Sequence, residues 1–261
     1  MTRTISKGLA GIVEALELEQ KELVTSEYLD ELVARHDIRS PTRQVASRLR
    51  QRGWLLPTGQ RGVWEFSPGA AAGPYGRGDR TVLLSAALSK RDLACGLTFQ
   101  AAAWAHGFAD RAPARLEVAA ASASVQAQLP KGLNVSVFAP HLSYQHAKRV
   151  PVLAVESVLV HMAAKPNHVR SWESALEWLP VLAAEAEHEA IAEELSNRAA
   201  TVGSRLGYLL QAMRPDISSL IPPGTTKTWF GPRGPLLRHD NRWMIADTLL
   251  PFDPRNLQPA R

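Results

Sequence analysis

The sequence predicts an α+β protein in which an N-terminal winged helix-turn-helix domain precedes a larger mixed α/β domain. Three observations lead to this prediction. An arginine-rich helix followed by a β hairpin spans residues 39–66, and a Gly/Ala/Pro-rich stretch follows it directly. Beyond that stretch, helical periodicity and strand alternation both occur. We therefore predict a DNA-binding domain at 1–67, a linker at 68–78 and a second domain at 79–261.

Composition places the chain among ordinary globular proteins and favours an anionic partner. Of 261 residues, 45% are hydrophobic and 21% charged, with a formal net charge of +5. No apolar run approaches the ~20 residues of a membrane span, and the N-terminus lacks a signal-peptide core. The lone Cys95 excludes an intramolecular disulfide and fits a reducing compartment. We expect a cytoplasmic protein that does not enter membranes.

Two helices are predicted before the arginine-rich one. The first has apolar residues at helical spacing, namely Ile5, Leu9, Ile12, Val13 and Leu16. Thr25 and Ser26 cap the second, whose apolar stripe contains Leu29, Leu32 and Val33. The exposed side of this second helix is acidic, so in a three-helix unit only the third helix would face phosphates.

The third helix has a polar face suited to reading bases. Ser40 is its expected cap and Pro41 its first residue, and Gly53 ends it. Val45 and Leu49 would point inward. The opposite face carries arginine, glutamine and serine, whose side chains can bond guanine and adenine edges in the major groove.

A hairpin follows this helix, with strands at 54–56 and 63–66 and a tip at 57–62. Between Arg39 and Trp64 there are six arginines and no Asp or Glu. A solvated helix and a chance hairpin are the alternative. We favour duplex DNA and predict these contacts: Arg39, Thr42, Arg43, Gln44, Ser47, Arg50, Gln51 and Arg61.

The second domain mixes both element types. Helices are predicted at 80–89 and 97–106, from Pro151 to about 164, and from Ser171 to Met213 with breaks near Pro180 and Gly203. Half-buried strands are predicted around 116–118 and 133–137, and short strands at 226–230, 236–239 and 242–248. Pro215 is expected to stop the long helical region.

Motifs of catalysis are absent from the sequence. His141 and His146 have no further ligand at metal-binding spacing, and no phosphate-binding glycine loop occurs. The Gly203-Ser204 pair is not followed by the Asp-x-Asp carboxylates that a nucleotidyltransferase needs for Mg²⁺. We predict no catalytic, metal or cofactor site.

A glutamate-rich segment has two interpretations. Seven glutamates and no Lys or Arg lie between Ser171 and Asn197. A solvated helical face is the ordinary meaning of such a segment. A surface for a basic partner, or one that repels DNA, is the alternative.

Several segments together resemble AbiEi-like antitoxins of type IV toxin–antitoxin systems. They are LRQRGWLL at 49–56, GVWEFSPG at 62–69, LTFQAAAWAHGF at 97–108, RLGYLL at 205–210 and NRWMI at 241–245. The resemblance implies a non-enzymatic antitoxin that represses its own operon through the N-terminal domain. It also implies that the C-terminal domain opposes a nucleotidyltransferase-like toxin, without requiring a stable complex.

Two further functions stay open on the sequence. One is a winged-helix regulator that responds to a small ligand, and the other is an enzyme whose site is not recognisable. For the antitoxin we expect a monomer in solution, because no plain dimer face is visible. One winged helix covers few base pairs, so two copies would pair on an inverted repeat.

Overall fold

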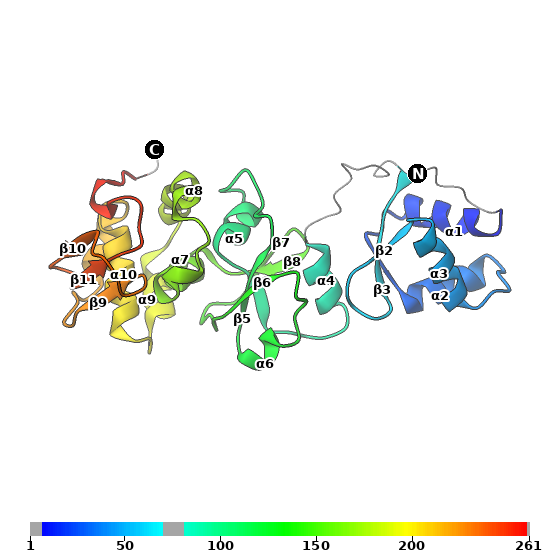
Figure 1. Ribbon diagram of the computed structural model, residues 1–261, viewed down its shortest axis with the longest axis horizontal. Helices are drawn as coiled ribbons and strands as arrows, with labels where there is room; N and C mark the ends of the chain where they lie inside the picture. The colour runs from blue at the N-terminus through cyan, green and yellow to red at the C-terminus, as the bar shows by residue number, and fades with distance from the viewer. Residues whose placement is uncertain (1–6, 70–80, 260–261) are drawn as a thin grey trace. The chain divides into compact units, whose positions relative to one another are not determined.

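The computed structural model describes residues 7–69 and 81–259 of the chain (Figure 1). They divide into two compact units. The first holds the described residues up to Leu93 together with Gln128–Leu133, and the second holds Ala94–Ala127 and the described residues from Asn134 onward. The mixture of helices and sheets confirms the predicted α+β class. Ile5 and all of the predicted linker except Pro68 and Gly69 lie outside the described residues, so the boundary stays a prediction.

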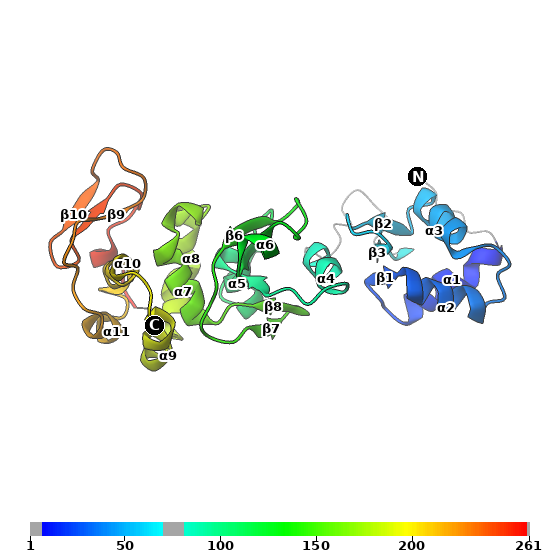
Figure 2. The ribbon, with the colours of Figure 1, turned by 90° about the horizontal axis from the view of Figure 1, so that it is seen from below.

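The first unit has the element order expected for a winged helix-turn-helix (Figure 2). Its elements are α1 (Lys7–Leu18), β1 (Leu23–Thr25), α2 (Ser26–Arg35), α3 (Thr42–Gln51), β2 (Leu55–Pro57), β3 (Val63–Phe66) and α4 (Val82–Leu88). The strands form an antiparallel sheet in the order β1-β3-β2. Strand β1 was not predicted, because three residues are too few to show an alternating pattern.

One hydrophobic core supports these elements. Helix α1 contributes Leu9, Ile12, Val13 and Leu16, and α2 contributes Leu29 and Leu32. The hairpin adds Leu55 and Phe66, and the ring of Trp54 stacks on that of Phe66 at 6.3 Å between centroids. The predicted cap of α2 is confirmed, since the Thr25 hydroxyl accepts the Tyr28 backbone N–H at 3.2 Å.

The second unit contains two sheets and most of the helices. Its elements are β4 (Cys95–Leu97), α5 (Phe99–His106), β5 (Glu117–Ala120), α6 (Ala123–Gln126), β6 (Asn134–Val137), β7 (Gln145–Ala147), β8 (Val150–Val152), α7 (Val155–Ala164), η2 (Pro166–His168), α8 (Trp172–Ala184), α9 (His188–Leu195), α10 (Ala200–Leu210), α11 (Pro215–Leu220), β9 (Thr228–Phe230), β10 (Arg238–Asp240), β11 (Ile245–Asp247) and η3 (Pro254–Asn256). The sheet orders are β6-β5-β4-β8-β7 and β10-β11-β9. None of the helices described is long and apolar enough to cross a membrane.

Prolines account for several errors in the predicted second unit. Pro151 lies in β8 and does not open a helix; α7 begins only at Val155. Pro180 lies inside α8, where buried neighbours such as Trp178 hold the helix together despite the lost hydrogen bond. Pro215 does not stop the long helical region, since α10 already ends at Leu210; it starts α11 instead, because a first helical residue needs no N–H partner. The breaks expected near Pro180 and Gly203 instead lie at 185–187 and 196–199.

The start of the second unit also differs from prediction. Residues 95–97 form strand β4, and the helix expected from 97 begins at Phe99. Strand β5 was expected to be half-buried, yet all four of its residues are buried. Its neighbours β4 and β6 flank it, and helices α5 and α6 pack against it. The buried Glu117 therefore carries an ionisable group into the interior.

Glu117 is expected to make the stability of this unit depend on pH. Its carboxylate accepts the Ala101 N–H at 3.2 Å, yet burial raises its pKa to about 7. The pKa of Glu117 is therefore higher in the folded chain than in the unfolded chain. Its contribution to the free energy of unfolding is fully present below the unfolded-state pKa and is lost as the pH rises through about 7. Relative to wild type, Glu117→Gln should gain about 2 kcal/mol between roughly pH 5 and pH 8. Urea unfolding of both proteins at the two pH values measures this gain. If the free energy of unfolding of the variant minus that of wild type is the same at both pH values, the prediction is wrong.

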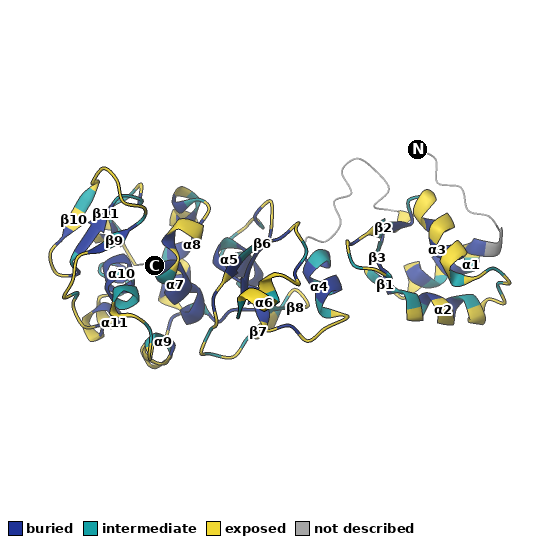
Figure 3. Cartoon of the chain, turned by 60° about the horizontal axis from the view of Figure 1, so that its bottom comes forward, coloured by how far each residue is buried: buried dark blue, intermediate teal, exposed yellow. Residues whose placement is uncertain are grey.

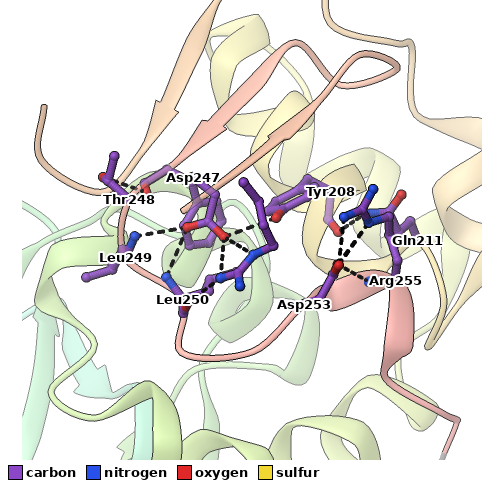
Figure 4. A network of polar contacts seen from close by, with 10 residues as sticks. Tyr208, Gln211, Asp247, Thr248, Leu249, Leu250, Asp253 and Arg255 are labelled. Carbon is purple, nitrogen blue, oxygen red and sulfur yellow. Dashed lines mark hydrogen bonds and ion pairs between the residues drawn. The ribbon is translucent and has the colours of Figure 1, made fainter. Parts of the chain in front are cut away.

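The small C-terminal sheet is held to α10 by packing and by one polar cluster. Gly207 on α10 lies against Trp243, whose ring would be 2.3 Å from an added Cβ atom, so only glycine fits there. Asp247 on β11 is fully buried and accepts hydrogen bonds from Tyr208, Arg238 and the backbone of the next turn (Figure 4). The cluster thus joins helix, sheet and C-terminal turn.

Candidate nucleic-acid interface

Helix α3 is fixed in the first unit by its apolar side. Val45, Ala46 and Leu49 are buried in the core, as their spacing predicts. The turn before α3 is closed by the backbone of α2, where Ile38 N–H donates to Val33 O at 3.0 Å. The predicted cap is wrong in detail, because Pro41 occupies the N-cap position and no side chain caps the helix. Ser40 therefore precedes the cap.

The polar side of α3 faces away from the core, as its exposed surface shows (Figure 3). Thr42 is partly buried at the first turn. The other predicted contacts on the helix are exposed: Arg43, Gln44, Ser47, Arg50 and Gln51. Arg39, before the helix, and Arg61, in the hairpin, are exposed as well. Helix α3 thus carries six of the eight predicted residues.

The hairpin tip, here called the wing and comprising residues 58–62, has a defined structure. The buried Thr58 hydroxyl donates to Val63 O at 2.8 Å and accepts the Gln60 N–H at 3.3 Å. Gly59 and Gly62 have φ angles of 82° and 75°, which glycine adopts without strain. Arg61 lies between these constraints, on an ordered turn.

Ser26 ties the wing to the helices. Its backbone N–H and its hydroxyl both donate to Gly62 O, at 2.8 and 3.1 Å. An added Cβ atom at Gly62 would lie 2.4 Å from the Ser26 hydroxyl oxygen. Sequence reasoning missed this contact, since 36 residues separate the partners. The result is that the wing and the first turn of α2 form one rigid piece.

The charged side chains of this unit fall into two groups, those that form ion pairs and those that do not. On the α2 side, Arg35 pairs with Glu19 at 3.1 Å, and Lys90 pairs with Glu27 at 2.9 Å. The Lys90 ammonium lowers the pKa of Glu27 to about 2. By contrast, no ion pair within residues 7–69 and 81–259 engages Arg39, which precedes α3, or the following arginines of α3 and the wing: Arg43, Arg48, Arg50 and Arg61. Their charge is available to phosphates.

The glutamate-rich segment of the second unit is less uniform than the sequence suggests. Six of its seven glutamates are exposed on or beside α8 and α9. Glu194 is fully buried: it pairs with Arg198 and accepts hydrogen bonds from the Ser157 hydroxyl and two backbone N–H groups. The candidate acidic surface therefore excludes Glu194, whose role is to join α9 to α7.

His161 forms a second buried polar cluster in this unit. Its ring lies between Phe99 and Phe138, and its nitrogens contact the hydroxyls of Thr98 at 2.8 Å and Ser136 at 3.1 Å. Burial lowers the pKa of His161 well below its ordinary value, so the ring is neutral. The cluster joins the end of β4, β6 and α7. In the described chain no three His, Cys, Asp or Glu side chains are arranged to hold a metal ion.

Comparison with known proteins adds family and fold. Residues 94–212 match the model of the AbiEi antitoxin C-terminal domain, which confirms the resemblance to AbiEi-like antitoxins. The chain is also similar to the crystal structure of the RV2827C protein from Mycobacterium tuberculosis, with a TM-score of 0.81. That similarity covers 95% of this chain and 94% of the other at 21% identity, so it concerns the fold alone. No curated protein matches the chain significantly.

Proposed function

Because residues 94–212 match the AbiEi antitoxin C-terminal domain, we propose that this protein is an antitoxin that also represses its own operon. In this proposal the first unit binds duplex DNA at the operator, and the second opposes a nucleotidyltransferase-like toxin. The family match supports the antitoxin role. The observation that carries DNA binding is the uncompensated arginine surface of α3 and the wing.

The two parts of this surface fit different parts of a duplex. Arg43, Ser47 and Arg50 recur at helical spacing on the exposed side of α3, which suits entry into the major groove. Arg61 on the wing would contact the adjacent backbone or minor groove. Since Ser26 fixes the wing, both contacts would form without reorganising the protein.

Binding to the operator should depend steeply on salt. Each neutralised phosphate contributes about −0.9 to the slope of log affinity against log salt. Arg61→Ala should weaken operator and unrelated duplexes alike and make the slope less steep by about 1. Fluorescence anisotropy over a salt series measures both quantities. A loss confined to the operator sequence would show that Arg61 reads a base instead.

The operator itself should be an inverted repeat occupied by two copies. A single winged helix contacts few base pairs, and nanomolar specific affinity generally needs more than one module. A footprint on the promoter region of the operon is the direct measurement. Full affinity of one monomer for a single half-site would contradict this expectation.

Antitoxicity should be independent of DNA reading. The full-length protein carrying Arg43→Ala and Arg50→Ala, expressed from an unrelated promoter, is expected to rescue growth from the toxin as well as wild type does. Repression of its own promoter should be lost in the same cells. If rescue and repression disappear together while the variant remains folded, the proposed division between the units is wrong.

One feature is relevant to the alternative of a ligand-responsive regulator. A pocket of about 530 Å³ in the first unit is lined by wing residues and by Leu83 and 128–132. Its volume lies within the range of small-molecule sites, but the pocket is largely open to solvent, whereas such sites bury most of the ligand. If this alternative holds, adding a metabolite should release the protein from its operator. If the protein is an antitoxin, its expression should instead rescue growth from the toxin.

A further inference from the structure

The C-terminal sheet presents one row of side chains on the face away from α10. The register pairs His239 on β10 with Ala246 on β11, and Ala246 with Trp229 on β9. Residues opposite one another in neighbouring strands point to the same face. The alternate residues Phe230 and Asp247 contact Tyr208 of α10, which identifies the other face as the inner one. His239 and Trp229 therefore flank a buried alanine on the outer face.

This outer row combines an aromatic ring with accessible charge. Trp229 is partly exposed and His239 is exposed, and Lys227 lies with its ammonium 5.1 Å from the centre of the Trp229 ring. The strand that bears Trp229 is at the edge of the sheet. Because the Lys227 ammonium lies over the Trp229 ring, a planar ligand would displace this ammonium or stack on the part of the indole that it leaves exposed.

Further cations without carboxylate partners lie near the two ends of this sheet. Arg242 lies in the turn that precedes β11, at the Lys227 end of the sheet, but its guanidinium lies over the inward-facing Trp243 ring, 4.9 Å from the ring centre. Arg233 lies in the exposed connection after β9, at the opposite end. No ion pair in the described chain engages Lys227, Arg233 or Arg242. The nearby acids are occupied or buried: Asp253 pairs with Arg255, and Asp240 and Asp247 are buried.

The backbone at Trp229 is fixed before any ligand arrives. Arg205 on α10 donates its Nε–H to Trp229 O at 2.8 Å, and its Nη1 reaches Ala163 O at 3.4 Å. The Arg205 guanidinium thus satisfies the Trp229 carbonyl, which has no strand partner because β9 is at the edge of the sheet. It also adds a fourth cation that has no carboxylate partner in the part of the chain described. The ring is therefore held on a rigid strand.

We propose that this face is a second nucleic-acid site, which binds unpaired nucleotides by stacking a base on Trp229 and contacting phosphates with Lys227 and Arg233. Stacking on an aromatic ring combined with a cationic groove is the usual recognition of single strands. The site is separate from α3, which is suited to duplex DNA, and it does not depend on antitoxin activity. Single-stranded DNA and RNA share this chemistry, so both are candidate ligands.

The test measures binding of labelled single-stranded DNA and RNA of about ten nucleotides to the full-length protein by anisotropy. Arg43→Ala and Arg50→Ala are included in every protein, so that α3 contributes little. Trp229→Ala should weaken binding about 5- to 150-fold, whereas Trp229→Phe should stay close to the parent. Lys227→Ala should make the salt slope less steep by about 0.7. Preference for RNA over DNA would identify contacts to the 2′-hydroxyl.

Two controls separate stacking from a loss of structure. Trp104 is also partly exposed, with the Lys148 ammonium 5.4 Å from its ring centre, and Trp104→Ala should leave binding unchanged. Trp229→Leu keeps apolar volume for folding but removes the ring, and it should bind as weakly as the alanine variant. The proposal is overturned if the parent binds neither strand, if Trp229→Leu binds as tightly as the parent, or if Trp104→Ala weakens binding equally.

Discussion

Replacing Asp247 by alanine is expected to destabilise the C-terminal half of the protein by about 3–5 kcal/mol. The side chain is fully buried, and Oδ2 accepts hydrogen bonds from the Tyr208 hydroxyl at 3.1 Å and Arg238 Nε at 3.0 Å. Oδ1 accepts the N–H groups of Leu249 and Leu250 at 2.9 and 3.0 Å. Alanine would leave a largely buried guanidinium without its anion and three further donors without acceptors.

The same cluster supplies a matched control. Asp253 pairs with Arg255 at 2.7 Å, but the Arg255 side chain is 50% exposed (Figure 4). Solvent screens such a pair, and Asp253→Ala should cost about 1 kcal/mol, most of it from the lost cap of η3. Urea unfolding of both variants measures the contrast. Similar costs at the two positions would show that burial of Asp247 does not determine its contribution.

The second large effect is expected when arginines of the proposed DNA-binding surface on α3 are replaced. Arg43 and Arg50 lie two helical turns apart on the exposed side of α3, about 10 Å along its axis. Each contact to a base edge is worth about 1–3 kcal/mol, and contacts this far apart add nearly independently. The double alanine variant should therefore bind the operator at least about 30-fold more weakly. It should also lose base preference at the positions that the two arginines read.

Arg35 provides the comparison for this loss. It is an exposed arginine of the same unit, but it lies on α2 and pairs with Glu19. Arg35→Ala removes the same charge away from the proposed interface, so operator affinity should change little. If the α3 variant and Arg35→Ala lose operator affinity equally, the protein is attracted to DNA by its general positive charge. The proposal that α3 recognises the base sequence would then be wrong.

Sequence reasoning succeeded where local spacing determines structure. Val45 and Leu49 are four residues apart, which fixes the buried side of α3 and hence the side that Arg43 and Arg50 occupy. Two glycines with positive φ, Gly59 and Gly62, mark the hairpin tip. These short-range rules predict the helix, the hairpin and which side of the helix is exposed. The cap of α3 was expected at Ser40 but lies one residue later, at Pro41.

Features that depend on distant partners were not predictable from local patterns. Strand β8 exists because Val150 and Val152 are buried between β4 and β7, whereas Pro151 by itself resembles a helix start. Glu117 and Glu194 look like surface residues in the sequence, yet each is buried with at least one hydrogen-bond partner 16 or more residues away. The bond from Ser26 to Gly62 is of the same kind. Tertiary contacts decide such positions.

Cys95 has a practical consequence for studying these surfaces by site-specific labelling. It is the chain's one cysteine, it is buried in β4, and burial raises its thiol pKa to about 11. Thiol-reactive dyes attack thiolates, so the wild-type protein should react only slowly under native conditions. A single cysteine introduced beside these surfaces, at the exposed Ala34 of α2 or at the exposed Thr226 before β9, would then carry the label alone. Energy transfer to an end-labelled oligonucleotide could report separately which surface holds a duplex and which holds a single strand.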